Sequence, residues 1–358
     1  MAGGTTDQKE KVCVTGAGGF TGSWLVNLLL SKDYVVHGTV RQPGQSLPSL
    51  IVYTVSEYIY VYIYILCAHA GDSKYDHLNK LEKASENLKL FKADLLDYDS
   101  LRLAIEGCSG VFHVASPIPT YLKDSDPEAR IFQIMLSIKG TLNVLKACKE
   151  AKVKRVVVVS SLAAVVMNLE WPKDQVKDEN CWSVPEYMKT TKKWYYLSKT
   201  EAEREALEFG KRNGLEVVTV CPSLILGPIL QSTRKCSSFL IVMTIIGISV
   251  HIHILRVQGT GHVSCLCNIN GLVCVHTRAT LYECVGDLES LPCNYWTFVD
   301  VRDLAEALLL AYKKSEAAGE RYICHSHSIG IRDVPPEGWN RGLGKVDRLL
   351  YLYCIFPS

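Results

Sequence analysis

Short apolar runs alternate with longer, helix-periodic segments through the first two-thirds of the chain. The runs lie at residues 11–16, 34–41, 88–94, 110–117, 154–161 and 213–228. They are rich in valine and leucine, as strands buried on both faces are. Segments between them, such as 23–32 and 131–151, spread apolar side chains over a broad helical face. Strands separated by helices imply right-handed crossovers, so the pattern predicts an α/β fold with a doubly wound parallel sheet.

Three stretches break this rhythm. Residues 45–70 interrupt a strand-to-helix connection that usually takes about 2 to 6 residues. Residues 244–285 show no steady period, and residues 334–358 change character again. We expect all three to be foreign to the ancestral fold, as retained introns or a faulty gene model would produce. Surface insertions are the alternative, because loops tolerate added length. A spliced transcript that still encodes residues 58–66 would refute the first interpretation.

Composition narrows the class of protein. Of 358 residues, 48% are hydrophobic and 21% charged, and the formal charge is only +2, so we expect no nucleic-acid partner. The polar N-terminus lacks the apolar stretch of a secretory signal, and the 14 cysteines are not spaced as a disulfide framework; both favour reduced thiols in the cytoplasm. Segment 51–66 is interrupted by the charged residue Glu57, and segment 239–250 is too short to span a bilayer. We therefore expect no membrane anchorage.

A glycine-rich turn follows the first predicted strand and opens a helix. Gly16, Gly19 and Gly22 form a GxxGxxG pattern within residues 15–22. Glycines there permit a tight turn and a close approach of the backbone to a pyrophosphate, which the helix N-terminus then stabilises. Because the pattern lies between a strand and a helix, it predicts a dinucleotide site on a Rossmann fold. The candidate contacts are Thr15, Gly16, Gly18, Gly19, Phe20 and Gly22.

The end of the second predicted strand bears on the choice of cofactor. NAD-binding proteins usually place an acidic residue there to hold the ribose hydroxyls, whereas this chain has Arg41. A guanidinium pairs well with a 2′-phosphate, which favours NADP. A solvated surface arginine is the alternative interpretation.

Tyr195 and Lys199 lie four residues apart in a clear helical segment, so both face the same side. A phenol near pKa 10 exchanges protons poorly at neutral pH until a nearby cation favours its anion. Lys199 can supply that cation, and Ser161, at the end of the fifth strand, can hydrogen-bond a substrate oxygen. The three residues therefore predict proton transfer coupled to hydride transfer from NADPH.

These motifs resemble the extended short-chain dehydrogenases of plants, and most of all the cinnamoyl-CoA reductases and their reductase-like relatives. The matching stretches are VCVTGAGGF, GTVRQP, KADLLDYDSL, GVFHVASP, KRVVVVSS, WYYLSK, VCPSLILGP and TFVDVRDLAEALLLAY. The resemblance implies an NADP-dependent oxidoreductase without an obligate protein partner. It also implies that Tyr195 and Lys199 contact the cofactor, together with Asp94, Leu95, Val114, Ala115, Ser116, Pro222, Ser223, Leu224, Ile225 and Ser237. Core packing is the alternative role of the apolar members.

The residues around the expected catalytic tyrosine bear on the choice of substrate. Around the catalytic tyrosine, typical cinnamoyl-CoA reductases read KNWYCYGK, whereas this chain reads KKWYYLSK at residues 192–199. The expected substrate is an aromatic acyl-CoA thioester or an aldehyde. A dihydroflavonol-type ketone reductase or an alcohol dehydrogenase is the alternative, and an NADP-binding non-enzyme, or the inactive product of a faulty gene model, is the alternative of another class.

Domain organisation follows from these assignments. We expect an NADP-binding Rossmann domain at residues 10–240, the rest of an interrupted, truncated substrate lobe with the last Rossmann elements at 241–333, and an atypical tail at 334–358.

Cysteines and histidines are frequent in the irregular region, but their spacing matches no paired-ligand pattern, so we predict no metal site. The residues concerned are His251, His253, His262, Cys265, Cys267, Cys274 and His276.

Overall fold

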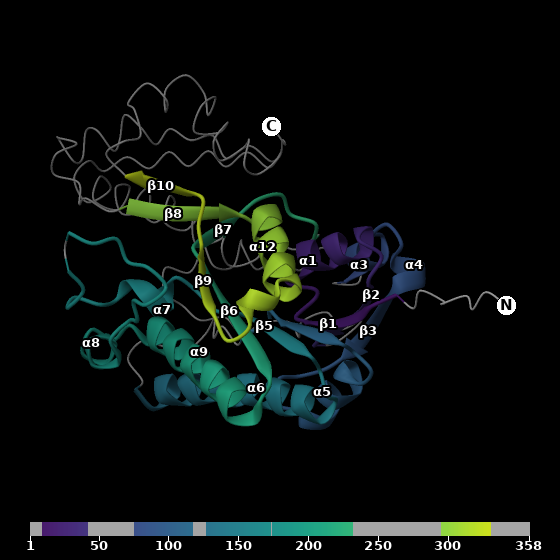
Figure 1. Cartoon of the computed structure of the whole chain (residues 1–358), viewed down its shortest axis with the longest axis horizontal. Helices are drawn as coiled ribbons and strands as arrows, with labels where there is room; N and C mark the ends of the chain where they lie inside the picture. Colours follow the sequence, from purple (N-terminus) through teal and green to yellow (C-terminus); the bar gives the residue numbers. More distant parts are fainter. Residues whose placement is uncertain (1–8, 42–74, 117–126, 173, 232–294, 331–358) are drawn as a thin grey trace, which may run out of the picture. The chain divides into compact units, whose positions relative to one another are not determined.

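The structure is a computed structural model that describes residues 9–41, 75–116, 127–172, 174–231 and 295–330. Its main sheet has seven parallel strands in the order β3-β2-β1-β4-β5-β6-β9 (Figure 1). The order changes direction between β1 and β4, which is the topological switch point where doubly wound folds bind ligands. The prediction of a Rossmann sheet is confirmed.

The strands of this sheet are short, and helices connect most of them. The strands are β1 (Lys11–Thr15), β2 (Val35–Val40), β3 (Leu88–Lys92), β4 (Gly110–His113), β5 (Arg155–Val159), β6 (Glu216–Pro222) and β9 (Arg321–Cys324). The longer helices are α1 (Phe20–Ser31), α5 (Tyr98–Ile105), α6 (Pro127–Glu150), α9 (Trp194–Asn213) and α12 (Val301–Lys313). The shorter ones are α3 (Asp76–Asn79), α4 (Ala84–Asn87), α7 (Ala163–Val166), α8 (Pro185–Thr190) and the 3-10 turn η2 (Ser315–Ala317).

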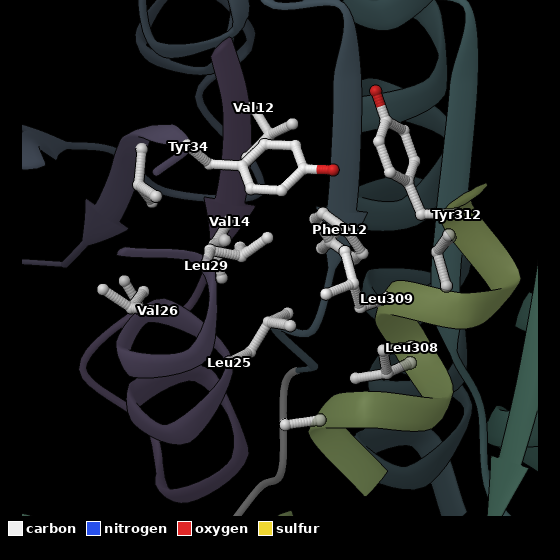
Figure 2. Close-up of a cluster of buried hydrophobic side chains, with 14 of the residues drawn as sticks. Val12, Val14, Leu25, Val26, Leu29, Tyr34, Phe112, Leu308, Leu309 and Tyr312 are labelled. Carbon is white, nitrogen blue, oxygen red and sulfur yellow. The ribbon is translucent and has the colours of Figure 1, made fainter. Parts of the chain in front are cut away.

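Two hydrophobic layers cover the two faces of the sheet. On one face Val12 and Val14 of β1 pack with α1 and α12, and Leu29 and Leu308 come from those helices (Figure 2). On the other face Cys13, the residue between the two valines, packs against α5, α6 and α9. Alternate residues of a strand thus enter different layers, which explains why the strands read as continuous apolar runs.

Local signals set several element boundaries. The Asp97 side chain caps α5 by accepting from the Ser100 amide at 3.3 Å, and Asp300 caps α12 by accepting from the Arg302 amide at 2.8 Å. Helix α9 ends at Asn213, followed by Gly214 with φ of 64°, as the predicted Asn-Gly stop requires.

The predicted strand at 213–228 divides into two. Strand β6 ends at Pro222, and residues Leu224–Leu226 form the separate strand β7. Pro222 has no amide hydrogen to extend a hydrogen-bonded ladder, which accounts for the break at this point.

The chain divides into two compact units. Of the described residues, the main sheet and its helices belong to the first. The second includes residues 226–228, 295–298 and 326–330, which contribute to a three-stranded sheet in the order β10-β8-β7. Strands β8 (Tyr295–Asp300) and β10 (His327–Gly330) pair antiparallel in it. The domain boundaries predicted above stay predictions.

The stretches 45–70, 244–285 and 334–358 lie outside the described residues, so their interpretation as insertions also stays a prediction. The same holds for the apolar segments 51–66 and 239–250. In the part of the chain that the structure describes, no helix combines the length and the apolar character that crossing a membrane requires.

Candidate active site

The turn between β1 and α1 has the form that its glycines predict. Gly16 has φ of 71°, in the left-handed region that favours glycine. A Cβ atom on Gly22 would lie 2.2 Å from the Gly16 carbonyl oxygen, so only glycine allows α1 to start so close to the loop. The Gly19 amide, at the N-cap of α1, donates to the Gly16 oxygen at 2.8 Å. Phe20 is the first residue of this 12-residue helix, whose N-terminus is suited to a phosphate.

Thr15 joins the glycine turn to the neighbouring strand β4. Its hydroxyl oxygen lies 2.9 Å from His113 Nδ1 and accepts from the Ala115 amide at 3.1 Å. The Gly16 amide meanwhile donates to Thr39 Oγ1 of β2 at 3.1 Å. The turn is therefore tied to the carboxyl ends of β2 and β4, the strands on both sides of β1.

His113 is a buried, neutral connector in this network. Its Nε2 atom lies 3.3 Å from Thr141 Oγ1, whose own hydroxyl donates to the Ser137 oxygen at 2.9 Å. Since the Thr141 hydroxyl donates to Ser137, its oxygen can only accept from the imidazole, so the single ring hydrogen is assigned to Nε2. Nδ1 is then left to accept from the Thr15 hydroxyl. Burial, together with the nearby Lys199 charge, lowers the pKa of His113 to about 3.

The predicted adenine-side residues follow β2 and β3. Arg41 is exposed directly after β2. Asp94 is exposed after β3, and its Oδ1 accepts from the Leu96 amide at 2.8 Å. Leu95 is partly buried, and its carbonyl oxygen accepts from Asn143 Nδ2 at 2.9 Å. The structure thus places these residues at the carboxyl edge of the sheet.

The predicted nicotinamide-side residues follow β4 and β6. Val114, Ala115 and Ser116 are half-buried directly after β4. The segment Pro222–Ile225 continues from β6, with Pro222 and Ser223 buried and Leu224 and Ile225 half-buried. Ser223 Oγ is buried, and no described residue hydrogen-bonds it. Ser237 lies outside the described residues.

The predicted catalytic residues come from β5 and α9. Ser161 follows β5 and begins the turn into α7, where its Oγ accepts from the Ala163 amide at 3.2 Å. Tyr195 lies in the first turn of α9 with 39% of its surface exposed. Lys199 lies one turn further along the same face, and α7 packs against α9.

Lys199 is half-buried on α9, and its ammonium group is desolvated. Burial lowers the pKa of its ammonium group to about 8, while the negative charge of Glu203 acts in the opposite direction. Its charge in turn helps to lower the pKa of His113 at the end of β4. Lys199 is therefore near enough for its charge to act on His113, whose Nδ1 lies 2.9 Å from the Thr15 hydroxyl at the start of the glycine turn.

This arrangement agrees with the comparison with known proteins. A family model for the NAD dependent epimerase/dehydratase family matches residues 12–245. The chain belongs to this family.

Similar members of the epimerase/dehydratase family come from plants. The chain is 39% identical to Cinnamoyl-CoA reductase 1 of Petunia hybrida, over 91% of this chain and 75% of that protein. It is 37% identical to Cinnamoyl-CoA reductase 2 of Medicago truncatula, over 88% of this chain and 71% of that protein. The resemblance inferred from the motifs is confirmed.

Solved structures of the same fold include vestitone reductase from alfalfa. It superposes with a TM-score of 0.60 at 29% identity, over 94% of this chain and 82% of that chain. Yeast methylglyoxal/isovaleraldehyde reductase Gre2, solved with NADPH, superposes with a TM-score of 0.57 over 90% of this chain and 80% of that chain. At 22% identity, the second match shows the fold alone.

The carboxyl edge of the sheet fits the nicotinamide dinucleotide on which this family depends. The turn at Gly16 and Gly22 leaves no room for side chains where a pyrophosphate approaches the backbone. The buried hydroxyl of Ser223 is a free hydrogen-bonding group at the end of β6, as far as the described residues show. A bound polar ligand would account for both features, because its phosphates would fill the space at the turn and its polar atoms could hydrogen-bond the Ser223 hydroxyl.

A metal would need a different arrangement. The described ranges contain no group of three or more His, Cys, Asp or Glu side chains placed to hold an ion. The cysteines and histidines between residues 251 and 276 lie outside those ranges.

Two groups beside Lys199 had no role in the sequence prediction. His113 lies within the strand predicted at residues 110–117, and its polarity among apolar neighbours was the available signal. Glu203 continues the spacing of four residues from Tyr195 and Lys199, so helical periodicity could have placed it on their face. Its partner Arg321 is 118 residues away and gives no such local signal.

Proposed function

We propose that this protein is an NADPH-dependent reductase of an aromatic acyl-CoA thioester or aldehyde. The observation that carries the proposal is the combination of three features at the carboxyl ends of the strands: the glycine turn after β1, Ser161 after β5, and the Tyr-Lys helix α9 packed against α7. A dinucleotide on the turn would then extend toward the residues suited to proton transfer. The similarity to Cinnamoyl-CoA reductase 1 and Cinnamoyl-CoA reductase 2 supports the aromatic acyl-CoA class.

Each catalytic residue would have a distinct role. The Ser161 hydroxyl donates a hydrogen bond to the carbonyl oxygen of the substrate and holds it beside the Tyr195 phenol. The Lys199 ammonium stabilises the phenolate that remains when Tyr195 gives its proton to that oxygen. The bound nicotinamide supplies the hydride. An aldehyde would leave as the alcohol; a thioester would gain hydride and proton and leave as aldehyde and free thiol.

The decisive test is NADPH oxidation with cinnamoyl-CoA, an aromatic aldehyde and a dihydroflavonol in parallel. Because Tyr195→Phe keeps the ring and removes the proton donor, turnover should fall by about 10²- to 10⁴-fold while NADPH binding is retained. The control is Tyr187→Phe, on the neighbouring helix α8. Binding of NADPH without turnover of every substrate would instead favour a non-enzyme.

A ketone substrate is the second candidate. The motif around Tyr195 departs from that of typical cinnamoyl-CoA reductases at residues 193 and 196–198. Vestitone reductase from alfalfa is a structural relative, and the chain is also 40% identical to a putative anthocyanidin reductase of Ginkgo biloba over 64% of that protein. Faster turnover of the dihydroflavonol than of cinnamoyl-CoA would select this candidate.

The preference for NADP over NAD rests on Arg41. Its exposed guanidinium after β2 is suited to bind a 2′-phosphate. Arg41→Ala should lower kcat/KM for NADPH about tenfold or more and leave kcat/KM for NADH within about twofold. Arg102→Ala, which removes another exposed arginine on α5, is the matched control. An equal loss with both cofactors would refute the role.

We also propose a cytoplasmic location. The six cysteines that the structure describes are free thiols, as proteins of reducing compartments keep them. Subcellular fractionation of the untagged protein would test this, and recovery with secreted or organellar markers would contradict it.

A further inference from the structure

A buried carboxylate lies one helical turn below Lys199. Glu203 is fully buried in α9, and its Oε1 accepts from Arg321 Nε at 2.7 Å and from Thr219 Oγ1 at 2.8 Å. Its Oε2 accepts from Ser160 Oγ at 2.5 Å. The Cys221 thiol lies 3.2 Å from Oε1. Strands β6 and β9, and Ser160 directly after β5, thus each direct a side chain to this one carboxylate.

Arg321 extends the network to the loops near the site. Its Nη1 donates to the carbonyl oxygens of Cys181 at 2.6 Å and Glu179 at 3.0 Å, and its Nη2 donates to Ala164 at 3.0 Å. The guanidinium also lies 3.7 Å from the Trp182 ring centroid. Each of the three guanidinium nitrogens of Arg321 therefore donates at least one hydrogen bond, as a buried cation requires.

The network touches both parts of the catalytic set. Ser160, which donates to Glu203, directly precedes Ser161, and the Ser160 amide donates to the Val220 oxygen at 2.8 Å. Glu203 follows Lys199 by four residues on α9, so the two side chains share one helix face. Glu203 is thus joined by one hydrogen bond to the turn of Ser161 and by one helical turn to Lys199.

The groups that face Lys199 come from three elements. Glu203 lies on its own helix, Cys221 on β6 and His113 on β4. Burial of both the Cys221 thiol and the His113 imidazole favours their neutral forms, because burial raises the pKa of the first and lowers the pKa of the second. Glu203 is therefore the group among these three that supplies a negative charge to the Lys199 ammonium.

We propose that Glu203, held by Arg321, is a positioning residue for the reduction: it fixes the turn that carries Ser161 and places a buried negative charge beside Lys199. The inference rests on the proposed function. Because Lys199 must be protonated to stabilise the Tyr195 phenolate, the charge of Glu203 extends the active range of the enzyme toward alkaline pH. An ion pair that only stabilises the fold would not affect the pH range of activity.

The first experiment compares pH profiles of kcat/KM. Lys199 loses its proton as the pH rises through about 8, so the wild-type rate should fall on that side. Glu203→Gln keeps the size of the side chain and removes the charge, so the alkaline limb should move about one pH unit lower. At pH 8, where half of the wild-type lysine is protonated, this variant should be about fivefold slower, and about tenfold slower at higher pH, with the KM for NADPH within about threefold. Glu216→Gln, which breaks the other buried arginine pair, should leave the limb in place.

The second experiment needs neither cofactor nor turnover. The side-chain resonances of isotope-labelled lysines report protonation directly, and the signal missing from Lys199→Met identifies Lys199. In the cofactor-free protein, Glu203→Gln should lower the titration midpoint of that signal by about the same one unit. An unchanged midpoint in Glu203→Gln would overturn the inference, and so would an equal change in Glu216→Gln.

Two further variants keep the inference testable if Glu203→Gln folds poorly. The double variant Glu203→Gln/Arg321→Gln leaves no unpaired buried charge and should move the midpoint in the same direction. Ser160→Ala keeps the charge and removes the hydrogen bond, so kcat should fall severalfold while the midpoint stays. A wild-type protein that turns over no substrate, but shows the expected lysine titration, would refute the proposed function and leave the charge effect standing.

Discussion

Two buried arginines lie on different strands of the main sheet, and each forms an ion pair with a glutamate. Arg155 starts β5 and pairs with Glu216, whose side chain is 38% exposed, at 2.7 Å. Arg321 starts β9 and pairs with Glu203, which is fully buried, also at 2.7 Å. Both guanidiniums also donate hydrogen bonds to backbone carbonyl oxygens. Arg155 donates to carbonyl oxygens at the end of α12, such as that of Tyr312 at 2.9 Å, and Arg321 donates to carbonyl oxygens in and near α7.

The difference between the pairs lies in the access of water to the carboxylate. Water can hydrate and screen Glu216, so its ion pair with Arg155 only links the amino-terminal ends of β5 and β6. Glu203 has only protein donors, and its charge acts on its neighbours through a poorly polarisable medium. The two ion pairs therefore have equal distances but differ in burial, and burial is the reason why we propose that the charge of Glu203 acts on Lys199.

The largest expected effect is that of removing each arginine. Arg321→Met leaves the Glu203 carboxylate buried and unpaired, so unfolding free energy should fall by about 3–5 kcal/mol. Arg155→Met leaves carbonyl oxygens without donors but a carboxylate that water can reach, so the loss should be about 1–3 kcal/mol. Urea unfolding of both variants measures the difference. Equal losses would show that the exposure of the glutamate does not distinguish the pairs.

Double-mutant cycles sharpen the comparison. Removing both partners with Glu203→Met and Arg321→Met should recover part of the loss, with a coupling energy of about 2–3 kcal/mol. The cycle with Glu216→Met and Arg155→Met should give about 1 kcal/mol or less. Chemical denaturation of the four variants of each cycle measures these values. A larger coupling energy for the half-exposed pair would contradict the assignment.

A buried network without an ion pair provides a third case. The folded-state pKa of His113 is about 3, below its ordinary value, so only the unfolded state binds the proton between about pH 6.5 and 3. Stability from this residue is present above that window and is lost on acidification, at up to about 1.4 kcal/mol per pH unit. His113→Asn should flatten this dependence in cofactor-free unfolding experiments, whereas the exposed His325→Asn is the control. An unchanged slope in His113→Asn would refute the neutral assignment.

The smallest expected effect is that of salt. Raising the ionic strength to about 1 M shortens the screening length to about 3 Å and should reduce the destabilisation caused by Glu216→Gln, itself about 1 kcal/mol or less. The destabilisation caused by Glu203→Gln should stay constant, because ions do not reach a fully buried group. Thermal unfolding at low and high salt separates the two. Equal salt sensitivity would show that the core pair is hydrated.

The sequence predicted the parts of the site whose causes are local. Gly16 and Gly22 are required by a backbone angle and by a contact within one turn, so their spacing alone indicated the dinucleotide turn. Tyr195 and Lys199 share a helix face because the helical period is 3.6 residues, and Gly214 ends that helix through its left-handed backbone. Continuous apolar runs identified strands covered on both faces.

Only the tertiary structure decided which polar groups lie inside and what charge they carry. Arg321 meets Glu203 across 118 residues of chain, and His113 meets Thr15 across 98. Such pairings depend on the order of the strands and on the packing of the helices, and neither of these leaves a periodic pattern in the sequence. The charge state follows in turn from the water excluded by that packing, because desolvation makes His113 neutral and sets the proton affinity of Lys199. The sequence determined which ionisable and hydrogen-bonding groups are present, and burial in the folded chain determined their protonation states.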